Sequence, residues 1–330
     1  MDEKIADLLA QYDLKVYRAG RVKGAWILET EKGLKSLGSI SYSEGKVRFD
    51  QKIKEFAAGN GFSAVDLYVP NREQQFLVQG PYNEMFVMRN WFAGEECDVK
   101  CREQVLLAVE TLARLHTCMI GLKLSDEEKE FCRQPRLTET LEKRNKELRR
   151  VRTYIRAKKQ KSMFEQKFLS QFDFQFAQAE YANDLLMKEA YNHYYETMLE
   201  SGSMLHGSFT HHSVIVLPEG NMAVTGFDKA MVGIQIFDFY LLFRKMMEKW
   251  EWNVALGADM LKAYNHIRPI PKEEYCLLHI LLAYPEKFWK VANQYYNNRK
   301  SWIPEKNMQK LLQTMEQAEK KEESIKALFL

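Results

Sequence analysis

The glycines of this chain are unevenly distributed, and this constrains the fold more than any other feature. Of the 16 glycines in 330 residues, nine fall within the first 94 residues, and none occurs between Gly121 and Gly202. In the first region glycines separate short β-branched and aromatic runs, as turns separate the strands of a sheet. The glycine-free interval carries long apolar patterns at helical spacing. The sequence therefore predicts a small N-terminal sheet followed by a larger helical part.

The N-terminal region contains candidate strands and one candidate helix. Residues 47–58 have helical spacing, and the pattern ends at Gly59. β-branched and aromatic runs bounded by turn residues predict strands at 14–17, 25–30, 34–40, 76–78 and 85–91. We expect these strands to form hairpins of an antiparallel sheet, with the single helix crossing it.

Helical spacing dominates beyond the first 94 residues. A helix is predicted at 103–116, and at least two more between 137 and 194, which we expect to form an antiparallel pair. A strand-and-loop island at 204–238 interrupts the helices, which then resume. The sequence thus predicts an α+β fold in two parts, residues 1–92 and residues 93–330.

Composition excludes several classes of protein. Hydrophobic residues make up 46% of the chain and charged residues 28%, which is ordinary for a globular protein. The first nine residues are acidic and amphipathic, unlike a signal peptide. The most continuous apolar stretch, 275–284, is shorter than the roughly 18 to 20 residues that span a bilayer. The net charge of +3 is too small to indicate a nucleic-acid partner.

Neither the cysteines nor the histidines form a complete metal-binding pattern. Five scattered cysteines do not form a disulfide framework and indicate synthesis in a reducing cytoplasm. Cys97 and Cys101 lie four residues apart without further ligands, and the pair His211 and His212 is not completed by nearby carboxylates. We therefore expect no bound metal.

A resemblance to a known family rests on several ordered segments. A small sheet with one helix, a helical part and an island that opens with Leu205-His206-Gly207 is the layout of the aminoglycoside and choline phosphotransferase branch of the kinase superfamily. Within that branch the chain resembles the CotS-type spore coat proteins over essentially its whole length. The segments that carry this resemblance are 88–98, 226–230, 263–270, 284–290 and 295–304.

The resemblance implies a bilobal, protein-kinase-like fold. Its N-terminal lobe, residues 1–92, would hold a small antiparallel sheet with one crossing helix. Its C-terminal lobe, residues 93–330, would be mainly helical and would contain a degenerate catalytic-loop island at 204–238. The family also implies a structural protein of the bacterial endospore coat, made in the mother-cell cytoplasm and then assembled with other spore coat proteins.

Two residues needed for phosphoryl transfer are replaced. The resembled fold reads His-Gly-Asp, four residues and then Asn, where this chain has residues 206–213. By that resemblance Ser208 replaces the catalytic Asp and Ser213 replaces the metal-binding Asn. A hydroxyl is a poor base at neutral pH and a poor ligand for Mg²⁺. Loss of the base alone costs on the order of 10² to 10⁴ in rate.

Two further catalytic positions also depart from the pattern. The usual Ile-Asp-Phe corresponds to residues 225–227, so Gly226 replaces the second metal-binding Asp. Asp228 lies two positions later, on the same side of a β-like segment, where a shifted metal role and a structural hydrogen bond are both open and the latter is favoured. The third-strand lysine of the resembled fold falls near Gly38, with Lys35 as the candidate displaced residue.

Other positions are implied to keep a structural role. His206 and Asp238 match residues that brace the catalytic loop through hydrogen bonds to the backbone. Met88, Asn90 and Phe227 match the nucleotide cleft, which we expect to be degenerate. We therefore expect no catalytic residue and no cofactor. ATP and Mg²⁺ belong only to the alternative hypothesis, an active or residual phosphotransferase acting on a small molecule or coat component.

The segment 143–161 is predicted to form an amphipathic basic helix. Apolar residues mark one face, and basic residues mark the other: Arg149, Arg150, Arg152 and Arg156. Clustered positive charge attracts polyanions, so this face is a candidate site for an acidic coat partner, nucleic acid or an anionic membrane surface, although a solvated helix face is the favoured interpretation. No flat aromatic platform accompanies the charges, which argues against nucleic acid. The oligomeric state stays open.

Overall fold

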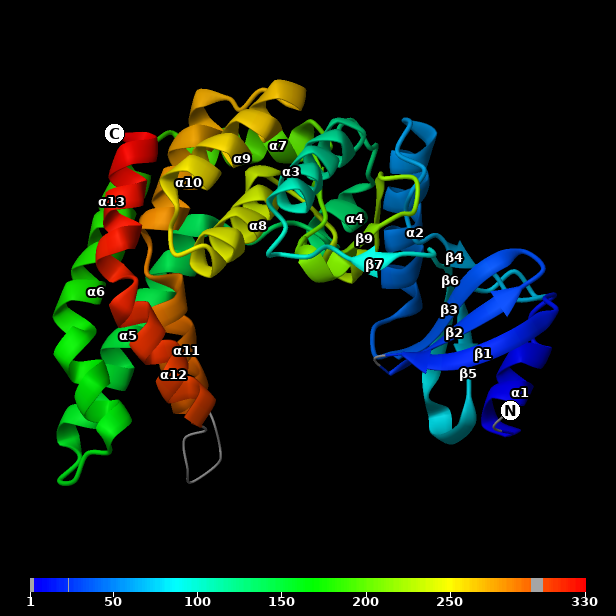
Figure 1. Cartoon of the computed structure of the whole chain (residues 1–330), viewed down its shortest axis with the longest axis horizontal. Coiled ribbons are helices and arrows are strands. Elements are labelled where there is room, and N and C mark those ends of the chain that lie inside the picture. The colour runs from blue at the N-terminus through cyan, green and yellow to red at the C-terminus, as the bar shows by residue number, and fades with distance from the viewer. Residues whose placement is uncertain (1–2, 23, 298–304) are drawn as a thin grey trace. The chain divides into compact units, whose positions relative to one another are not determined.

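The computed structural model describes residues 3–22, 24–297 and 305–330 (Figure 1). Positions 298–304 of the last family-like segment lie outside these ranges. The chain divides into two compact units. The first comprises residues 1–133, 201–242 and 266–268, and the second comprises residues 134–200, 243–265 and 269–330. The predicted boundary between residues 92 and 93 falls inside the first unit.

A six-stranded antiparallel sheet forms the frame of the first unit. Its order is β1-β2-β3-β6-β4, and β5 also pairs with β6. The strands are β1 (Val16–Val22), β2 (Ala25–Thr30), β3 (Gly33–Ile40), β4 (Tyr68–Val69), β5 (Leu77–Gln79) and β6 (Met85–Asn90). A short 3₁₀ turn, η1 (Pro81–Asn83), connects β5 and β6.

One helix packs on each face of this sheet, because successive strand residues point to opposite faces. Helix α1 (Glu3–Ala10) covers the face that carries Leu37 and Met88. Helix α2 (Glu44–Gly59) crosses the other face, where its Val47 contacts Val87 (Figure 1). The Ser43 side chain caps the start of α2. Any site under α2 is therefore lined by the strand residues that share the face of Val87.

The rest of the first unit consists of two short sheets, two helices and the start of a third. Strand β9 pairs with both β10 and β7, and β8 pairs with β11. These elements are β7 (Glu95–Glu96), α3 (Arg102–Thr117), α4 (Asp126–Phe131), β8 (Met204–Leu205), η2 (His211–Ser213), β9 (Val214–Val216), β10 (Met222–Val224), η3 (Phe227–Lys229), β11 (Met231–Val232) and α8 (Ile236–Lys249). Residues distant in sequence thus complete one unit.

The second unit is helical. Beyond the end of α8 it contains α5 (Leu137–Ala157), α6 (Met163–Lys188), α7 (Tyr191–Glu200), α9 (Val254–Ile267), α10 (Lys272–Ala283), α11 (Glu286–Asn297), α12 (Glu305–Glu316) and α13 (Ala318–Phe329). Helices α5, α6, α11 and α12 run side by side in Figure 1. Their shared core holds Phe168, Phe172 and Phe288, and the Phe168 and Phe288 rings stack 4.8 Å apart.

The predicted fold class is confirmed. An antiparallel sheet with one crossing helix precedes a mainly helical remainder, as expected. Residues 275–283 of the apolar stretch lie in helix α10, and Tyr284 is its C-cap. Among the helices of the described residues, none combines the length and hydropathy needed to cross a membrane.

Candidate functional site

The loop that follows β8 is held in place by one buried carboxylate. Asp238, in the first turn of α8, accepts hydrogen bonds from the backbone N–H of His206 at 2.5 Å and of Gly207 at 2.8 Å. His116 of α3 places its Nε2 3.2 Å from the same carboxylate. Gly207 has a φ of +77°, and a side chain there would clash with the Lys229 carbonyl oxygen. The loop conformation therefore depends on Asp238 and on glycine at 207.

His206 joins this loop to the segment that follows β10. Its Nε2 lies 3.0 Å from the Thr225 carbonyl oxygen, and its ring lies 4.6 Å from the ring of Phe227. The side chain is fully buried, and burial lowers the pKa of His206. A neutral imidazole at physiological pH fits a structural role between the two segments.

The two serines at the expected reaction centre bond to nearby backbone groups, Ser208 to the segment after β10 and Ser213 to its own loop. Ser208 Oγ lies 3.4 Å from the Gly226 carbonyl oxygen and 3.4 Å from His206 Nδ1. Ser213 Oγ donates to the Thr210 carbonyl oxygen at 2.8 Å and accepts from the Thr210 N–H at 3.0 Å. Both hydroxyls therefore stabilise the loop and add no carboxylate or amide ligand to it.

Gly226 begins the turn η3 in a left-handed conformation. Its φ is +81°, and its N–H donates to Asp66 Oδ2 at 3.1 Å. A Cβ atom built on Gly226 would lie 4.0 Å from Asp228 Oδ1, so the Asp228 carboxylate lies near the side-chain space that glycine leaves empty.

Asp228 itself is exposed and lines an open polar cavity with Tyr42 and Arg89. Within the described part of the chain its carboxylate has no hydrogen bond or ion pair. We favoured a structural hydrogen bond for Asp228, and its carboxylate forms none with the described residues.

The third strand places Gly38 and Lys35 on opposite faces of the sheet. Gly38 pairs with Val87 on the face under α2, whereas Lys35 pairs with Asn90 on the face that α1 covers. The Lys35 ammonium donates to the Asn90 side chain at 2.9 Å and to the Lys32 carbonyl at 2.6 Å. Strand alternation thus directs Lys35 away from the α2 face.

A buried charged cluster lies under α2, and we did not predict it from the sequence. Lys54 Nζ lies 3.1 Å from Asp66 Oδ1 and donates to the Asp66 carbonyl oxygen at 2.8 Å. Arg89 Nε lies 3.8 Å from Asp66 Oδ2, and the Tyr68 ring lies under both cations. The Lys54 and Asp66 side chains are almost fully buried, and burial lowers the pKa of Lys54 although Asp66 opposes this.

A second ion pair ties the start of α2 to the segment after η3. Lys46 donates to Asp50 Oδ1 at 2.5 Å and to the Ala230 carbonyl oxygen at 2.9 Å. The recurrence of charge at 46, 50 and 54, every fourth residue on an otherwise apolar helix face, is the sequence signal that predicts this arrangement. Lys46 of α2 and Asp66, which lies just before β4, thus hold the two ends of residues 226–230.

The structure brings some predicted residues together and separates others. Phe227 is buried between His206 and Lys54, with the Lys54 ammonium 5.7 Å from its ring. Met88 instead packs under α1, on the opposite face of the sheet from Val87. Met88 and Asn90 therefore do not share a lining with Phe227, because the even-numbered residues of β6 point away from α2.

The predicted basic face lies on α5 and is partly neutralised. Arg152 pairs with Asp173 of α6 at 2.6 Å, and Arg149 lies 3.5 Å from Glu180 of the same helix. Arg150 and Arg156 are exposed and have no ion-pair partner among residues 3–22, 24–297 and 305–330. Only the latter two present unpaired charge to solvent.

The donor atoms of this loop do not fit a Mg²⁺-nucleotide site of the phosphotransferase type. Such sites hold the metal with carboxylate or amide oxygens. Here the Ser208 and Ser213 hydroxyls bond to the carbonyls of Gly226 and Thr210, and Gly226 has no side chain. Across the described ranges no three His, Cys, Asp or Glu side chains cluster as metal ligands would.

Solved structures with the same fold were identified by comparison. An aminoglycoside phosphotransferase from Alicyclobacillus acidocaldarius has a TM-score of 0.86 at 20% identity, covering 97% of this chain and 93% of that one. A spectinomycin phosphotransferase solved with ADP and spectinomycin has a TM-score of 0.69 at 12% identity, covering 98% of each chain. At these identities the likeness shows the kinase-like phosphotransferase fold alone.

Comparison by sequence identifies the family. "Spore coat protein S" of Bacillus subtilis (strain 168) is 22% identical over 314 residues, which are 92% of this chain and 88% of that protein. A family model described as "Spore coat putative kinase YutH" matches residues 5–328, nearly the whole chain. The predicted resemblance is confirmed, and the chain belongs to this spore coat family of kinase-like proteins.

Proposed function

We propose that this chain is a non-catalytic assembly protein of the bacterial endospore coat that keeps a kinase-like fold for its shape and surface. It is made in the mother-cell cytoplasm and then joins the coat through contacts with other coat proteins. The proposal rests on the loop at 206–213, where the resemblance assigns Ser208 to the position of the base and Ser213 to that of a metal ligand, and where both hydroxyls are engaged in hydrogen bonds to backbone carbonyls.

The retained buried network supports the same conclusion. Asp238 holds the loop backbone, Asp66 holds Gly226, and Lys46 holds Ala230. Isolated buried charges are costly unless they are paired, so such a network persists where it fixes a conformation. Here it fixes the frame of a phosphotransferase loop without the groups that perform the chemistry.

Family membership supports the coat as the place where this chain acts. The matched family is named for the spore coat, and so is the curated relative from Bacillus subtilis. Fold likeness to aminoglycoside and spectinomycin phosphotransferases does not carry their substrates with it. The exposed Arg150 and Arg156 of α5 are the residues we assign to capture of an acidic coat partner.

Nucleotide binding tests the proposal directly. A ligand at about 100 times its dissociation constant adds about 2.7 kcal/mol of stability. We expect millimolar Mg-ATP to leave the melting temperature of the chain unchanged, and Asp228→Ala to give the same result. We also expect Ser208→Asp to release no phosphate from ATP, since Ser213 and Gly226 still leave the metal unheld.

The outcome that contradicts the proposal is specific. A Mg²⁺-dependent rise in melting temperature that disappears in Asp228→Ala would show that this carboxylate holds a metal-nucleotide complex. The assembly half is checked in sporulating cells that lack the native gene. There, Asp228→Ala should restore incorporation into the coat fraction, whereas the double variant Arg150→Glu and Arg156→Glu should not.

A further inference from the structure

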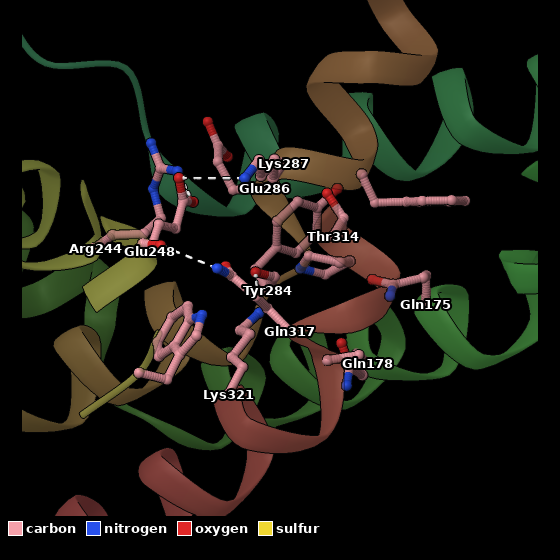
Figure 2. Close-up of a pocket in the computed structure, with 14 residues that line it drawn as sticks. Gln175, Gln178, Arg244, Glu248, Tyr284, Glu286, Lys287, Thr314, Gln317 and Lys321 are labelled. Carbon is pink, nitrogen blue, oxygen red and sulfur yellow. Dashed lines mark hydrogen bonds and ion pairs between the residues drawn. The ribbon is translucent and has the colours of Figure 1, made fainter. Parts of the chain in front are cut away.

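A small polar cavity lies in the second unit, away from the loop described above. It is bounded by the end of α8, by α6, and by the first turns of α11 and α13 (Figure 2). The space open to the centres of water molecules is about 30 Å³. Since one water needs about 10 to 15 Å³ by this measure, the cavity accommodates two or three waters or one small ion.

The charges around this cavity are unequal. Glu248 is shared by Arg244 and Lys287, and Glu286 is shared by Arg144 and Lys290. Each carboxylate is therefore already paired with two cations. Lys321 is the remaining cation, and the side chains that line the cavity carry three positive charges, on Arg244, Lys287 and Lys321, and two negative ones. The environment favours an additional negative charge.

Lys321 reaches the cavity without a carboxylate partner. Its ammonium donates to the Tyr284 carbonyl oxygen at 3.2 Å, and among the described residues it forms no ion pair. Burial, and then the nearby Arg244, lower the pKa of Lys321 to about 8, while Glu248 and Glu286 act in the opposite direction. Burial without a carboxylate partner destabilises the charged form of Lys321, and a bound anion would stabilise it.

An unpartnered amide supplies an independent observation. Gln175 of α6 is 98% buried, with 2% of its surface exposed, and its side chain has no hydrogen bond to any described residue. Figure 2 shows Gln175 and Gln178 reaching toward the cavity from α6, opposite Lys321 and Gln317. A buried amide without a protein partner requires a ligand or water in the adjacent space.

We propose that this cavity is a binding site for one small anion, of the size of chloride or formate, held by Lys321 and the Gln175 amide. The first turns of α11 and α13 line the site, and the positive ends of helix dipoles favour an anion there. Gluconate, with six carbon atoms, exceeds the two or three waters that this space holds. The site is separate from the 206–213 loop, so the proposal does not rest on the proposed function.

The test compares anions at constant ionic strength and pH 7. Sodium gluconate is replaced stepwise by chloride or by formate, and the melting temperature and ³⁵Cl NMR line width of the full chain are recorded. We expect saturable stabilisation and chloride line broadening with the wild-type chain. Lys321→Met should weaken the apparent affinity by about tenfold or more, because a charge-assisted hydrogen bond is lost.

Two further variants make the test specific. Lys320→Met is the matched control, since Lys320 is exposed and pairs with Glu251 at 2.6 Å, and it should bind chloride as the wild type does. Gln175→Leu keeps the volume but removes the amide and should also weaken binding. Absence of a saturable chloride response in the wild type would mean that the cavity holds only water. An equal response in Lys321→Met would place the anion elsewhere, and either result overturns the proposal.

Discussion

Asp50 is a fully buried carboxylate on α2, and its protonation links the structure to pH. Burial raises the pKa of Asp50 from the ordinary value of 3.8 to about 6, although Lys46 opposes the shift. The folded chain therefore binds this proton more tightly than the unfolded chain does. Between about pH 4 and pH 6 the folded state carries more protons, so this group's stabilising contribution is lost as pH rises.

This sign gives a prediction for Asp50→Asn. The variant cannot ionise, so it avoids the cost of charging the buried carboxyl above pH 6. We expect it to be more stable than the wild type at pH 7.5, by up to about 3 kcal/mol, and to lose that advantage at pH 4. Urea unfolding at the two pH values measures the difference.

A surface carboxylate is the control for this measurement. Asp184→Asn changes an exposed residue of α6 and should shift stability by no more than about 0.5 kcal/mol at either pH. If Asp50→Asn destabilises the chain equally at both pH values, the Asp50 carboxylate is stabilised by its ion pair with Lys46 and our assignment of the pKa shift to burial is wrong.

At the same scale, the sequence shows which catalytic residue types are absent, but not how the charged side chains pair in the folded chain. Ser208, Ser213 and Gly226 can be read from the order of residues alone. The pairing of Lys54 with Asp66 cannot, because it joins α2 to the start of β4 and depends on which helix face is buried. The partnership of Lys35 with Asn90 likewise follows from strand register, which is fixed only when β3 and β6 pair.

Helix α5 shows how an element modifies a surface predicted from sequence. Its basic residues lie close together in the sequence, yet they divide between two environments. Arg152 pairs with Asp173 and lies 4.5 Å from the Phe172 ring of α6, whereas Arg150 is exposed. The sequence predicted the amphipathic helix, and the packing of α6 decided which arginines remain available.

Charge reversal on α5 separates these two environments. Arg152→Glu loses an ion pair and a cation–π contact and places like charge beside Asp173, so we expect a loss of about 1–2 kcal/mol. Arg150→Glu should change stability by less than about 0.5 kcal/mol. Guanidinium unfolding at low salt checks both values. Equal losses for the two variants would show that the α5–α6 contact does not depend on Arg152.

The ends of the predicted strands also differ from those in the structure, because pairing with a neighbouring strand extends them. The first strand, predicted at 14–17, runs as β1 to Val22, because β2 pairs with Val16 and, after a register shift at Tyr17, with each residue from Arg18 to Val22. Glycine and arginine are weak strand formers, and the hydrogen bonds of the neighbouring strand override that preference. The helix predicted at 47–58 begins earlier, at Glu44, because the Ser43 side chain caps its first turn.

The division of the whole chain into units was the part least accessible to sequence. The first unit combines residues 1–133 with 201–242, and the joining contacts include β7 with β9 and the Gly226 N–H with Asp66. A boundary drawn by composition follows the chain in order. A unit defined by contacts does not, since segments more than 100 residues apart complete its core.

This organisation predicts how fragments of the chain behave. Residues 1–92 alone expose Asp50, Lys54 and Asp66, because the fragment lacks Ala230 and the rest of the 226–230 segment that covers and bonds them. We expect that fragment to give narrow amide NMR dispersion and no cooperative unfolding. A chain joining 1–133 to 201–242 through a short glycine-serine linker should show dispersed amides and a single transition, since Gly121 and Gly202 already share a backbone hydrogen bond of 3.2 Å. Cooperative unfolding of 1–92 by itself would contradict this account, because the charges under α2 would then be satisfied without residues 226–230.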